Sequence, residues 1–165
     1  MFDHHLTGRA EKLLQAMRER GMTIATAESC TGGLIAALLT EIPGSSDVVE
    51  RGFVTYSNQA KMDMLGVPAT TLASVGAVSR QTALAMAAGA LAASRATISV
   101  AVTGVAGPSG GTAEKPVGLV HLCVQRQGRA PRHHEARYGD LGRAGVRMAT
   151  VATALDMLFD ELATT

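Results

Sequence analysis

The residues with the greatest potential for chemistry gather in one short segment, Thr26-Ala27-Glu28-Ser29-Cys30-Thr31-Gly32-Gly33. An apolar, β-branched run precedes it and a helical run, Leu34 to Ile42, follows it, so we expect a strand, a tight turn and a helix start. A helix N-terminus offers unpaired N–H donors and a partial positive charge, which can hold an anion or steady a developing oxyanion. The segment therefore indicates either a phosphate-binding turn or a nucleophile with its oxyanion hole beside it.

A serine nucleophile needs a base, because its hydroxyl is nearly inert at neutral pH. None of the five histidines lies in a persuasive context, and their spacing predicts no metal site. Lys61 is the better candidate, since it falls on the first turn of a short helix predicted to start near Asn58. The helix dipole and burial would both lower the pKa of its amine. Tyr56, at the end of the preceding strand, could relay a proton or orient that amine.

Each of these residues also has a purely structural interpretation. Ser29 and Thr31 can simply cap a helix, and Lys61 can be a solvated surface lysine. Cys30 can be the nucleophile, because a helix N-terminus lowers a thiol pKa, or a small buried hydrophobic residue. A second glycine cluster, Gly104 to Gly111, is either a flexible turn or a ligand loop, and it leaves the carboxyl end of a predicted central strand.

Hydrophobic periodicity and turn residues predict how the chain is organised. Helices are expected over 6–17, 34–42, 58–64, 79–94 and 140–162, and strands over 22–27, 48–56, 97–103, 117–125 and 132–138. Residues 68–78 are expected to form a loop or an irregular link, and the last two strands a hairpin. This alternation predicts one domain over residues 1–165, a three-layer α/β/α domain with a mixed, mostly parallel sheet.

Composition narrows the classes of function. The chain has 165 residues, of which 47% are hydrophobic and 3% aromatic, and a formal charge of +1. The balanced charge argues against a nucleic-acid partner. Two cysteines cannot make a disulfide framework, so we expect a reducing cytoplasm. The charged N-terminal segment does not resemble a signal peptide, and the apolar tract 83–102 is expected to be a buried helix and strand rather than a membrane span.

Several motifs in a fixed order resemble the CinA C-terminal domain family. They are Ala27-Glu28-Ser29-Cys30-Thr31-Gly32-Gly33, Gly44-Ser45-Ser46, Arg51-Gly52-Phe53-Val54-Thr55-Tyr56-Ser57-Asn58 with Lys61, Gly76-Ala77-Val78-Ser79, Gly104-Val105-Ala106-Gly107-Pro108-Ser109-Gly110-Gly111 and Lys115-Pro116-Val117-Gly118. The resemblance extends from about Leu13 to Leu158, nearly the whole chain.

The resemblance implies hydrolysis of the carboxamide of nicotinamide mononucleotide to nicotinate mononucleotide and ammonia, in pyridine nucleotide recycling. It also implies a homo-oligomer, a dimer or larger, and no redox cofactor. In the family the motif serine is taken as the nucleophile, together with the lysine and tyrosine of the following segment, here Ser29, Lys61 and Tyr56. We expect N–H groups near Thr31, Gly32 and Gly33 to steady the oxyanion, and the Gly104–Gly111 loop, including Gly104 and Gly107, to hold ribose and phosphate with Ser45 or Ser46.

One segment departs from the family pattern. Members often carry Gly-Asp-Arg directly before the last helix, whereas here Asp140 is followed by Leu141-Gly142-Arg143. Arg143 is the displaced match, and its reach toward a substrate or a neighbouring subunit is the open question, with Arg147 as a residue that could share its role. Two other functions stay open: a non-catalytic nucleotide-binding regulatory domain of the same fold, and an amidase for a different small substrate.

Overall fold

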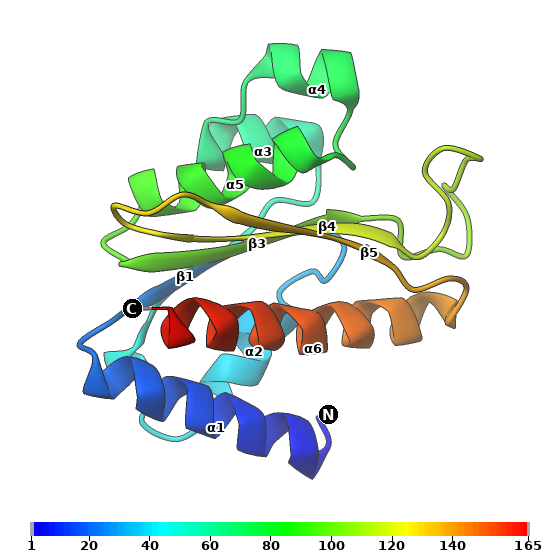
Figure 1. Cartoon of the computed structure of the whole chain (residues 1–165). Helices are drawn as coiled ribbons and strands as arrows, with labels where there is room; N and C mark the ends of the chain where they lie inside the picture. The colour runs from blue at the N-terminus through cyan, green and yellow to red at the C-terminus, as the bar shows by residue number, and fades with distance from the viewer. Residues whose placement is uncertain (1, 165) are drawn as a thin grey trace.

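A five-stranded sheet forms the middle layer of the computed structural model, which describes residues 2–164 (Figure 1). The strand order is β2-β1-β3-β4-β5, from β2 (Val49–Val54), β1 (Ile24–Glu28), β3 (Ile98–Gly104), β4 (Leu119–Arg126) and β5 (Arg132–Arg137). β1 pairs in parallel with β2 and β3, whereas β4 is antiparallel to both β3 and β5. The predicted mixed sheet and the terminal hairpin are both confirmed.

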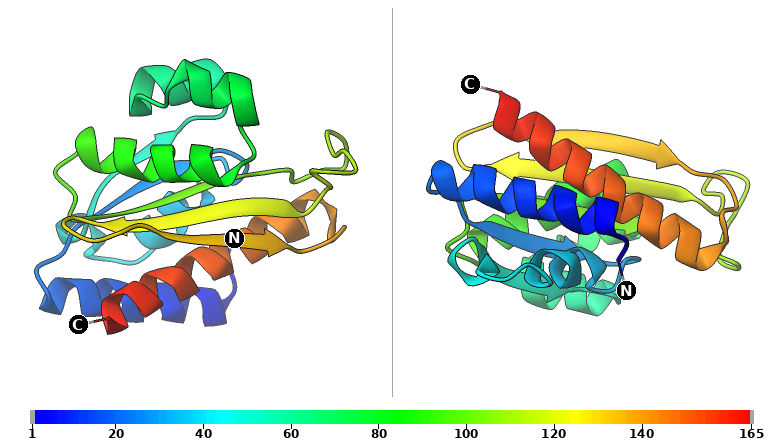
Figure 2. Two further views of the ribbon diagram at one scale, coloured as in Figure 1. Left: turned by 45° about the horizontal axis from the view of Figure 1, so that its top comes forward. Right: turned by 90° about the horizontal axis from the view of Figure 1, so that it is seen from below.

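Helices cover both faces of the sheet (Figures 1 and 2). One layer holds α1 (His4–Glu19), α2 (Leu34–Thr40) and α6 (Gly142–Ala163), and the other holds α3 (Asn58–Leu65), α4 (Ala69–Val75) and α5 (Arg80–Ala92). Side chains alternate along β3, so Val100 and Val102 join the core under α1 and α6 while Ala101 faces α5. The three layers confirm the predicted fold class.

The helix α4 was not expected from the sequence, which predicted a loop over 68–78. Pro68 starts this helix, Gly76 ends it, and of its seven residues only Leu72 is buried. A helix this short, with two β-branched threonines, has neither the length nor the apolar stripe that reveals a helix in a sequence. β2 is also shorter than predicted, because it ends at Val54 rather than at Tyr56.

The helices α3 and α5 approach each other closely. α5 lays an alanine-rich face on the sheet, with Ala83, Ala87 and Ala90 buried. On its other side, a Cβ added to Gly89 would overlap the backbone carbonyl of Leu65, the last residue of α3. Since α3 also carries Lys61, this glycine determines how near α3 comes to the sheet.

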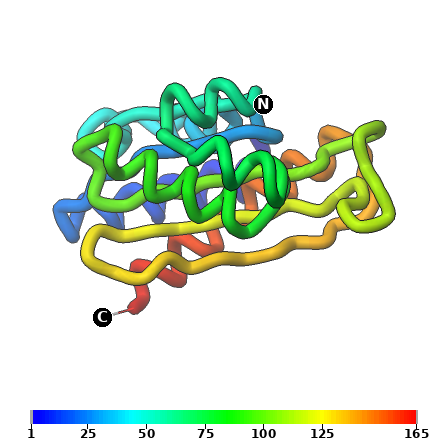
Figure 3. Tube along the Cα trace, turned by 90° about the horizontal axis from the view of Figure 1, so that it is seen from above, coloured from blue at the N-terminus to red at the C-terminus, as the bar shows by residue number. Residues whose placement is uncertain are grey.

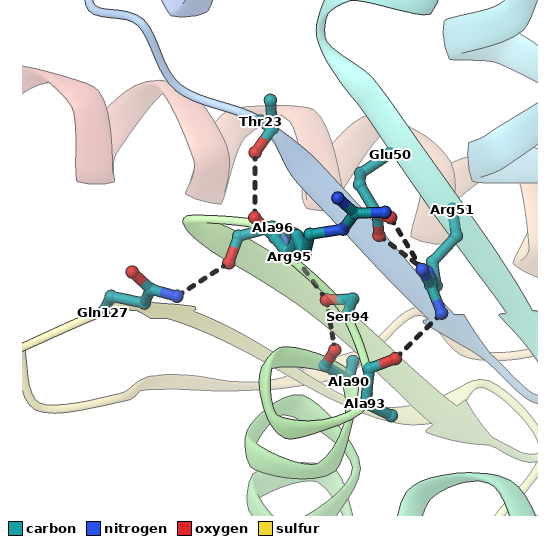
Figure 4. A network of polar contacts seen from close by, with 9 residues as sticks. All are labelled: Thr23, Glu50, Arg51, Ala90, Ala93, Ser94, Arg95, Ala96 and Gln127. Atoms are coloured by element: carbon teal, nitrogen blue, oxygen red, sulfur yellow. Dashed lines mark hydrogen bonds and ion pairs between the residues drawn. The ribbon is translucent and has the colours of Figure 1, made fainter.

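The two ends of the parallel strands carry different structures. Loops at the amino end are joined by a network in which Arg51 donates to Ala93 O (3.0 Å) and Gln127 donates to Ala96 O (3.0 Å) (Figure 4). At the carboxyl end, β1 leads into the Ser29 turn, and β3 leads into a long loop that extends past the sheet (Figure 3). Ligands of open α/β sheets bind at that carboxyl end.

Candidate active site

Ser29 follows the last residue of β1 and begins the predicted turn. Its N–H donates to Val102 O of β3 (3.0 Å), and its carbonyl accepts from Gly32 N (3.0 Å). Gly32 and Gly33 have φ values of 58° and 98°, a left-handed conformation that strains residues with a Cβ. The double glycine is therefore what allows the strand to reverse so sharply into α2.

Lys61 lies against this serine, although 32 residues separate the two in the chain. Its Nζ is 3.0 Å from Ser29 Oγ, and it donates to Thr55 O (2.8 Å) and to Tyr56 O (3.4 Å). The lysine side chain is among the most deeply buried in the protein, at 1% exposure, and within residues 2–164 it forms no ion pair. Burial lowers the pKa of the amine, because the charged form loses its hydration.

This geometry suits a general base. A neutral amine has two N–H donors and one lone pair, and the carbonyls of Thr55 and Tyr56 are placed to accept both donors. The remaining tetrahedral position faces Ser29 Oγ, so the lone pair can accept the hydroxyl proton. Because β2 ends before Thr55, these two carbonyls are free to turn toward the amine.

The serine and the lysine open into a cavity of about 310 Å³ at the carboxyl end of the sheet. The cavity lies between the Ser29 turn, the segment before α5 and the loop after β3. Its lining residues are Ser29, Cys30, Tyr56, Lys61, Ala77, Val78, Thr103, Gly104, Val105, Ala106, Gly107, Ser109, Gly110 and Arg143. Gly104 and Gly107 of the second glycine cluster therefore line this cavity, and their role in holding a ligand stays a prediction.

Arg143 reaches this cavity despite the altered segment before α6. Its guanidinium donates to Gly107 O (2.9 Å) and to the Tyr56 hydroxyl (2.9 Å). The phenol of Tyr56 therefore points to the arginine, and only its backbone carbonyl contacts Lys61. Tyr56 is 60% exposed, which places its ring at the cavity mouth rather than beside the amine it was expected to orient.

The start of α2 is not directed at the cavity in the way the sequence suggested. The N–H groups of Ile35 and Ala36 donate to the Glu28 carboxylate at 2.8 and 3.0 Å, and the Thr31 hydroxyl donates to the same group at 2.6 Å. Gly32 N is used within the turn itself. Thr31, Gly32 and Gly33 are also absent from the cavity lining, so this geometry does not support the expected oxyanion role for them.

Cys30 is the residue of the turn after Ser29 that does line the cavity. Within residues 2–164 its N–H donates to no other residue, so this group is available to an oxyanion. Its thiol is buried, and burial raises the thiol pKa to about 11. A thiol that stays protonated at neutral pH is a poor nucleophile, which favours Ser29 over Cys30.

Ser45 and Ser46 lie at the opposite end of the sheet from this cavity. They form a 3-10 turn, Ser45–Asp47, that leads into the start of β2, at the amino end of the parallel strands. After this turn Val48 O accepts a hydrogen bond from Ile24 N (2.8 Å), which begins the pairing of β1 and β2. The expectation that these serines hold a phosphate beside Ser29 is therefore not met by the fold.

Two charged residues, Glu28 and Arg147, form hydrogen bonds with the Ser29 turn but do not line the cavity. Arg147 of α6 donates to Cys30 O (3.1 Å) and to Thr31 O (2.9 Å), so it supports the turn instead of sharing the position of Arg143. Glu28 is the functional candidate that sequence reasoning missed. Its signal was present, because a lone acid ends an otherwise apolar strand directly before a helix start.

The histidines form a separate pair on the antiparallel strands. His121 Nδ1 and His133 Nε2 are 2.9 Å apart, and neither residue lines the cavity. Among residues 2–164 there is no group of three His, Cys, Asp or Glu side chains placed to hold a metal ion. No helix within that range is both long and apolar enough to cross a membrane.

The fold and the site together define a class: a three-layer α/β domain with a buried serine–lysine pair where a parallel strand turns into a helix. The CinA C-terminal domain pattern matches residues 6–162. The chain belongs to the CinA C-terminal domain family.

Individual relatives agree over nearly the full length. The nicotinamide-nucleotide amidohydrolase PncC of Escherichia coli strain K12 is 47% identical over 162 residues, which are 98% of this chain and 97% of that protein. A crystal structure of the competence/damage inducible protein CihA from Agrobacterium tumefaciens matches with a TM-score of 0.95 at 59% identity, over 97% of each chain. One of the competence damage-inducible protein A from Klebsiella pneumoniae matches at 0.92 and 34% identity, over 96% of this chain and 98% of that one.

Proposed function

We propose that this protein is a nicotinamide-nucleotide amidase, which hydrolyses nicotinamide mononucleotide to nicotinate mononucleotide and ammonia. The observation that carries the proposal is the contact between Ser29 Oγ and the unpaired, buried amine of Lys61 at 3.0 Å. The Escherichia coli relative, a nicotinamide-nucleotide amidohydrolase that matches over 98% of this chain, supplies the substrate class. The reaction returns a nucleotide to the pyridine pool, so we place the enzyme in pyridine nucleotide recycling.

The chemistry proceeds in two halves. Neutral Lys61 takes the hydroxyl proton while Ser29 Oγ attacks the carboxamide carbon, and the protonated amine then gives that proton to the departing nitrogen as ammonia leaves. Water attacks the resulting acyl-enzyme, one of its protons passes to Lys61 and then to Ser29 Oγ as the ester bond breaks, and the acid product releases its remaining proton to solvent to become the carboxylate. Cys30 N–H is the donor placed to steady the oxyanion, and losing such a donor costs about 10²–10³ in rate.

The other end of the cavity suits the phosphate of the nucleotide. Lys61 and Arg143 are the cationic side chains among its lining residues, and Lys61 is occupied by the chemistry. Arg143 already holds Gly107 O and the Tyr56 hydroxyl, so its guanidinium has a fixed direction at the cavity mouth. A guanidinium of this kind binds phosphate through paired N–H groups.

A non-catalytic nucleotide-binding domain would keep the same cavity without turnover. Such a domain has no need for an amine that is 1% exposed and lacks an ion pair. Burying that amine lowers the stability of the fold, and its benefit is a more reactive lysine. The buried pair therefore favours the enzyme over the binding domain.

The direct test supplies nicotinamide mononucleotide to the purified protein and measures ammonia and nicotinate mononucleotide. Ser29→Ala should lower turnover by about 10⁴-fold or more while the thermal unfolding transition is retained. Nicotinamide, which lacks ribose and phosphate, should be a far poorer substrate if Arg143 binds the phosphate. Calorimetry that shows nucleotide binding without ammonia release would instead favour the regulatory domain.

A further inference from the structure

Glu28 is an unusual group to find beside a nucleophile. It is the last residue of β1, it is fully buried at 0% exposure, and within residues 2–164 it forms no ion pair. A carboxylate in that environment is costly unless hydrogen bonds replace its hydration. Three donors do so: the Thr31 hydroxyl (2.6 Å), Ile35 N (2.8 Å) and Ala36 N (3.0 Å).

The other helices that this protein caps with a side chain use a residue next to the helix. Asp3, Ser57 and Ser79 each accept from a backbone N–H three residues later, at the starts of α1, α3 and α5. α2 has Gly33 at that position, with no side chain to accept, and the strand residue Glu28 reaches across to cap it. The cap of α2 therefore spans the Ser29 turn from one side to the other.

The bonds around this cap enclose Ser29. Thr55 N donates to the Glu28 carbonyl (2.9 Å), which anchors the strand side of the turn to the segment that also faces Lys61. On the helix side, the Glu28 carboxylate holds Thr31, and Arg147 holds the Thr31 carbonyl from α6 (2.9 Å). Ser29 lies between these anchors, so its distance to the amine is determined by groups that do not touch the substrate.

We propose that the Glu28 carboxylate is a positioning residue, which holds Ser29 Oγ in contact with Lys61 Nζ by tying the end of β1 to Thr31 and to the start of α2. This inference rests on the proposed function, because it assumes that Ser29 is the nucleophile. Glu28 has both oxygens engaged with protein donors and does not line the cavity, so it takes no part in binding or proton transfer. It acts on the attack step through geometry alone.

Glu28→Gln tests this role because it keeps the size of the side chain but replaces one acceptor oxygen by an NH₂ group. In either orientation of the amide that group would face a backbone N–H, of Ile35 or of Ala36, so the turn must shift. We expect kcat to fall about 10²-fold, the scale of a misplacement of about 1 Å, while KM changes less than threefold. Binding of the product nicotinate mononucleotide, measured by calorimetry, should change less than twofold, and labelling of Ser29 by a fluorophosphonate probe should slow by a factor similar to that for kcat.

Glu161→Gln is the matched control. Glu161 is also a buried carboxylate, at 3% exposure, but it lies near the end of α6 and pairs with Arg132 (3.0 Å) at the β4–β5 hairpin. Its loss should lower the melting temperature without changing kcat or the labelling rate. A purely structural Glu28 would behave in the same way, losing stability while the folded fraction keeps its full kcat.

The outcomes are separable. Folded Glu28→Gln enzyme with kcat within threefold of wild type, or with kcat and product affinity lost together, overturns the positioning role. If Glu28→Gln does not fold, Thr31→Val and Thr31→Ser decide, since only serine keeps the hydroxyl that bonds Glu28: kcat should be at least tenfold higher in the serine variant, and equal rates overturn the proposal. If the wild type releases no ammonia, the proposed function fails, and the rate of Ser29 labelling still reports whether Glu28 positions the hydroxyl.

Discussion

The two ends of the parallel strands differ in whether their charged side chains are paired and accessible to solvent or unpaired and buried. At the amino end, Arg51 pairs with Glu50 (2.7 Å) and donates to Ala93 O, and both arginine partners lie near solvent (Figure 4). At the carboxyl end, Lys61 is buried without a carboxylate partner and touches a serine hydroxyl. The first arrangement pairs a cation with a carboxylate, whereas in the second burial lowers the pKa of the amine.

The difference follows from what each end must do. Solvent-accessible ion pairs such as that of Arg51 with the half-buried Glu50 contribute little to stability, about 0–1 kcal/mol, and here the arginine also joins neighbouring segments. Burial of Lys61 costs stability but lowers the pKa of its amine and directs the lone pair at Ser29. The prediction from this contrast is that changes at the carboxyl end alter rates, and changes at the amino end do not.

The largest effect is expected for Lys61→Met, which keeps an apolar chain of similar length but removes the base. Turnover should fall about 10³-fold or more, since general-base catalysis contributes about 10²–10⁴. In the wild type, kcat should rise with pH through the pKa of Lys61, which burial holds below its ordinary value of 10.5. The variant should lose that limb of the profile, and Lys12→Met, an exposed lysine of α1, should keep it.

The pH dependence of folding stability is an independent test of the Lys61 amine. The folded state binds the Lys61 proton more weakly than the unfolded chain does, so wild-type stability rises with pH up to about 10.5 as the cost of burying the charge disappears. The stability of Lys61→Met relative to wild type should therefore be greatest near neutral pH and decline toward pH 10, measured by urea unfolding. A pH-independent difference, or turnover within tenfold of wild type, would mean that the amine is not the base.

A smaller effect is expected where the fold brings Lys61 to Ser29. Gly89→Ala should push α3 away from α5, because the new methyl group would overlap Leu65 O. We expect kcat to fall about tenfold and the free energy of unfolding to drop by about 1–3 kcal/mol, as for other overpacked sites. Steady-state kinetics and chemical denaturation measure the two effects.

Gly8→Ala is the control for this substitution. Gly8 also lies inside a helix, α1, but a Cβ there would meet nothing within 4 Å. Both substitutions gain helix propensity of about 0.5–1 kcal/mol, so Gly8→Ala should stabilise the protein and leave kcat unchanged. If Gly89→Ala also gained stability and kept its rate, α3 would not be held in place by this contact.

The sequence predicted the serine turn and the lysine because both depend on local signals. A β-branched run, a double glycine and a helix start define the Ser29 turn, and the capping Ser57 defines the helix that carries Lys61. The residues alone suggested Lys61 as the base for Ser29 but left it open as a surface lysine, and the family resemblance favoured the pairing. The sequence therefore predicted which residues form the site, but only in part the role of each residue.

What the sequence did not reveal depends on contacts between distant segments. Tyr56 was expected to serve the amine, but its hydroxyl meets Arg143, 87 residues away. Glu28 accepts from the N–H groups of Ile35 and Ala36 at the α2 start, and although a lone acid at the end of an apolar strand is visible in the sequence, the residues that it contacts across the turn are not. Ser45 and Ser46 share a motif with the family, but the direction of β2 puts them at the other end of the sheet.

The smallest effect is expected from replacing an exposed serine, and one such serine lies at each end of the parallel strands. Ser109 lines the cavity in the loop after β3, whereas Ser46 lies in the turn before β2. If the loop holds ribose or phosphate, Ser109→Ala should raise KM for nicotinamide mononucleotide about 2–10-fold, the value of one neutral hydrogen bond, with kcat little changed. Ser46→Ala should leave KM and kcat within twofold and stability within about 0.5 kcal/mol. A higher KM from Ser46→Ala alone would show that the amino end takes part in binding, and since one chain keeps the two ends apart, the second serine would then have to come from a neighbouring copy.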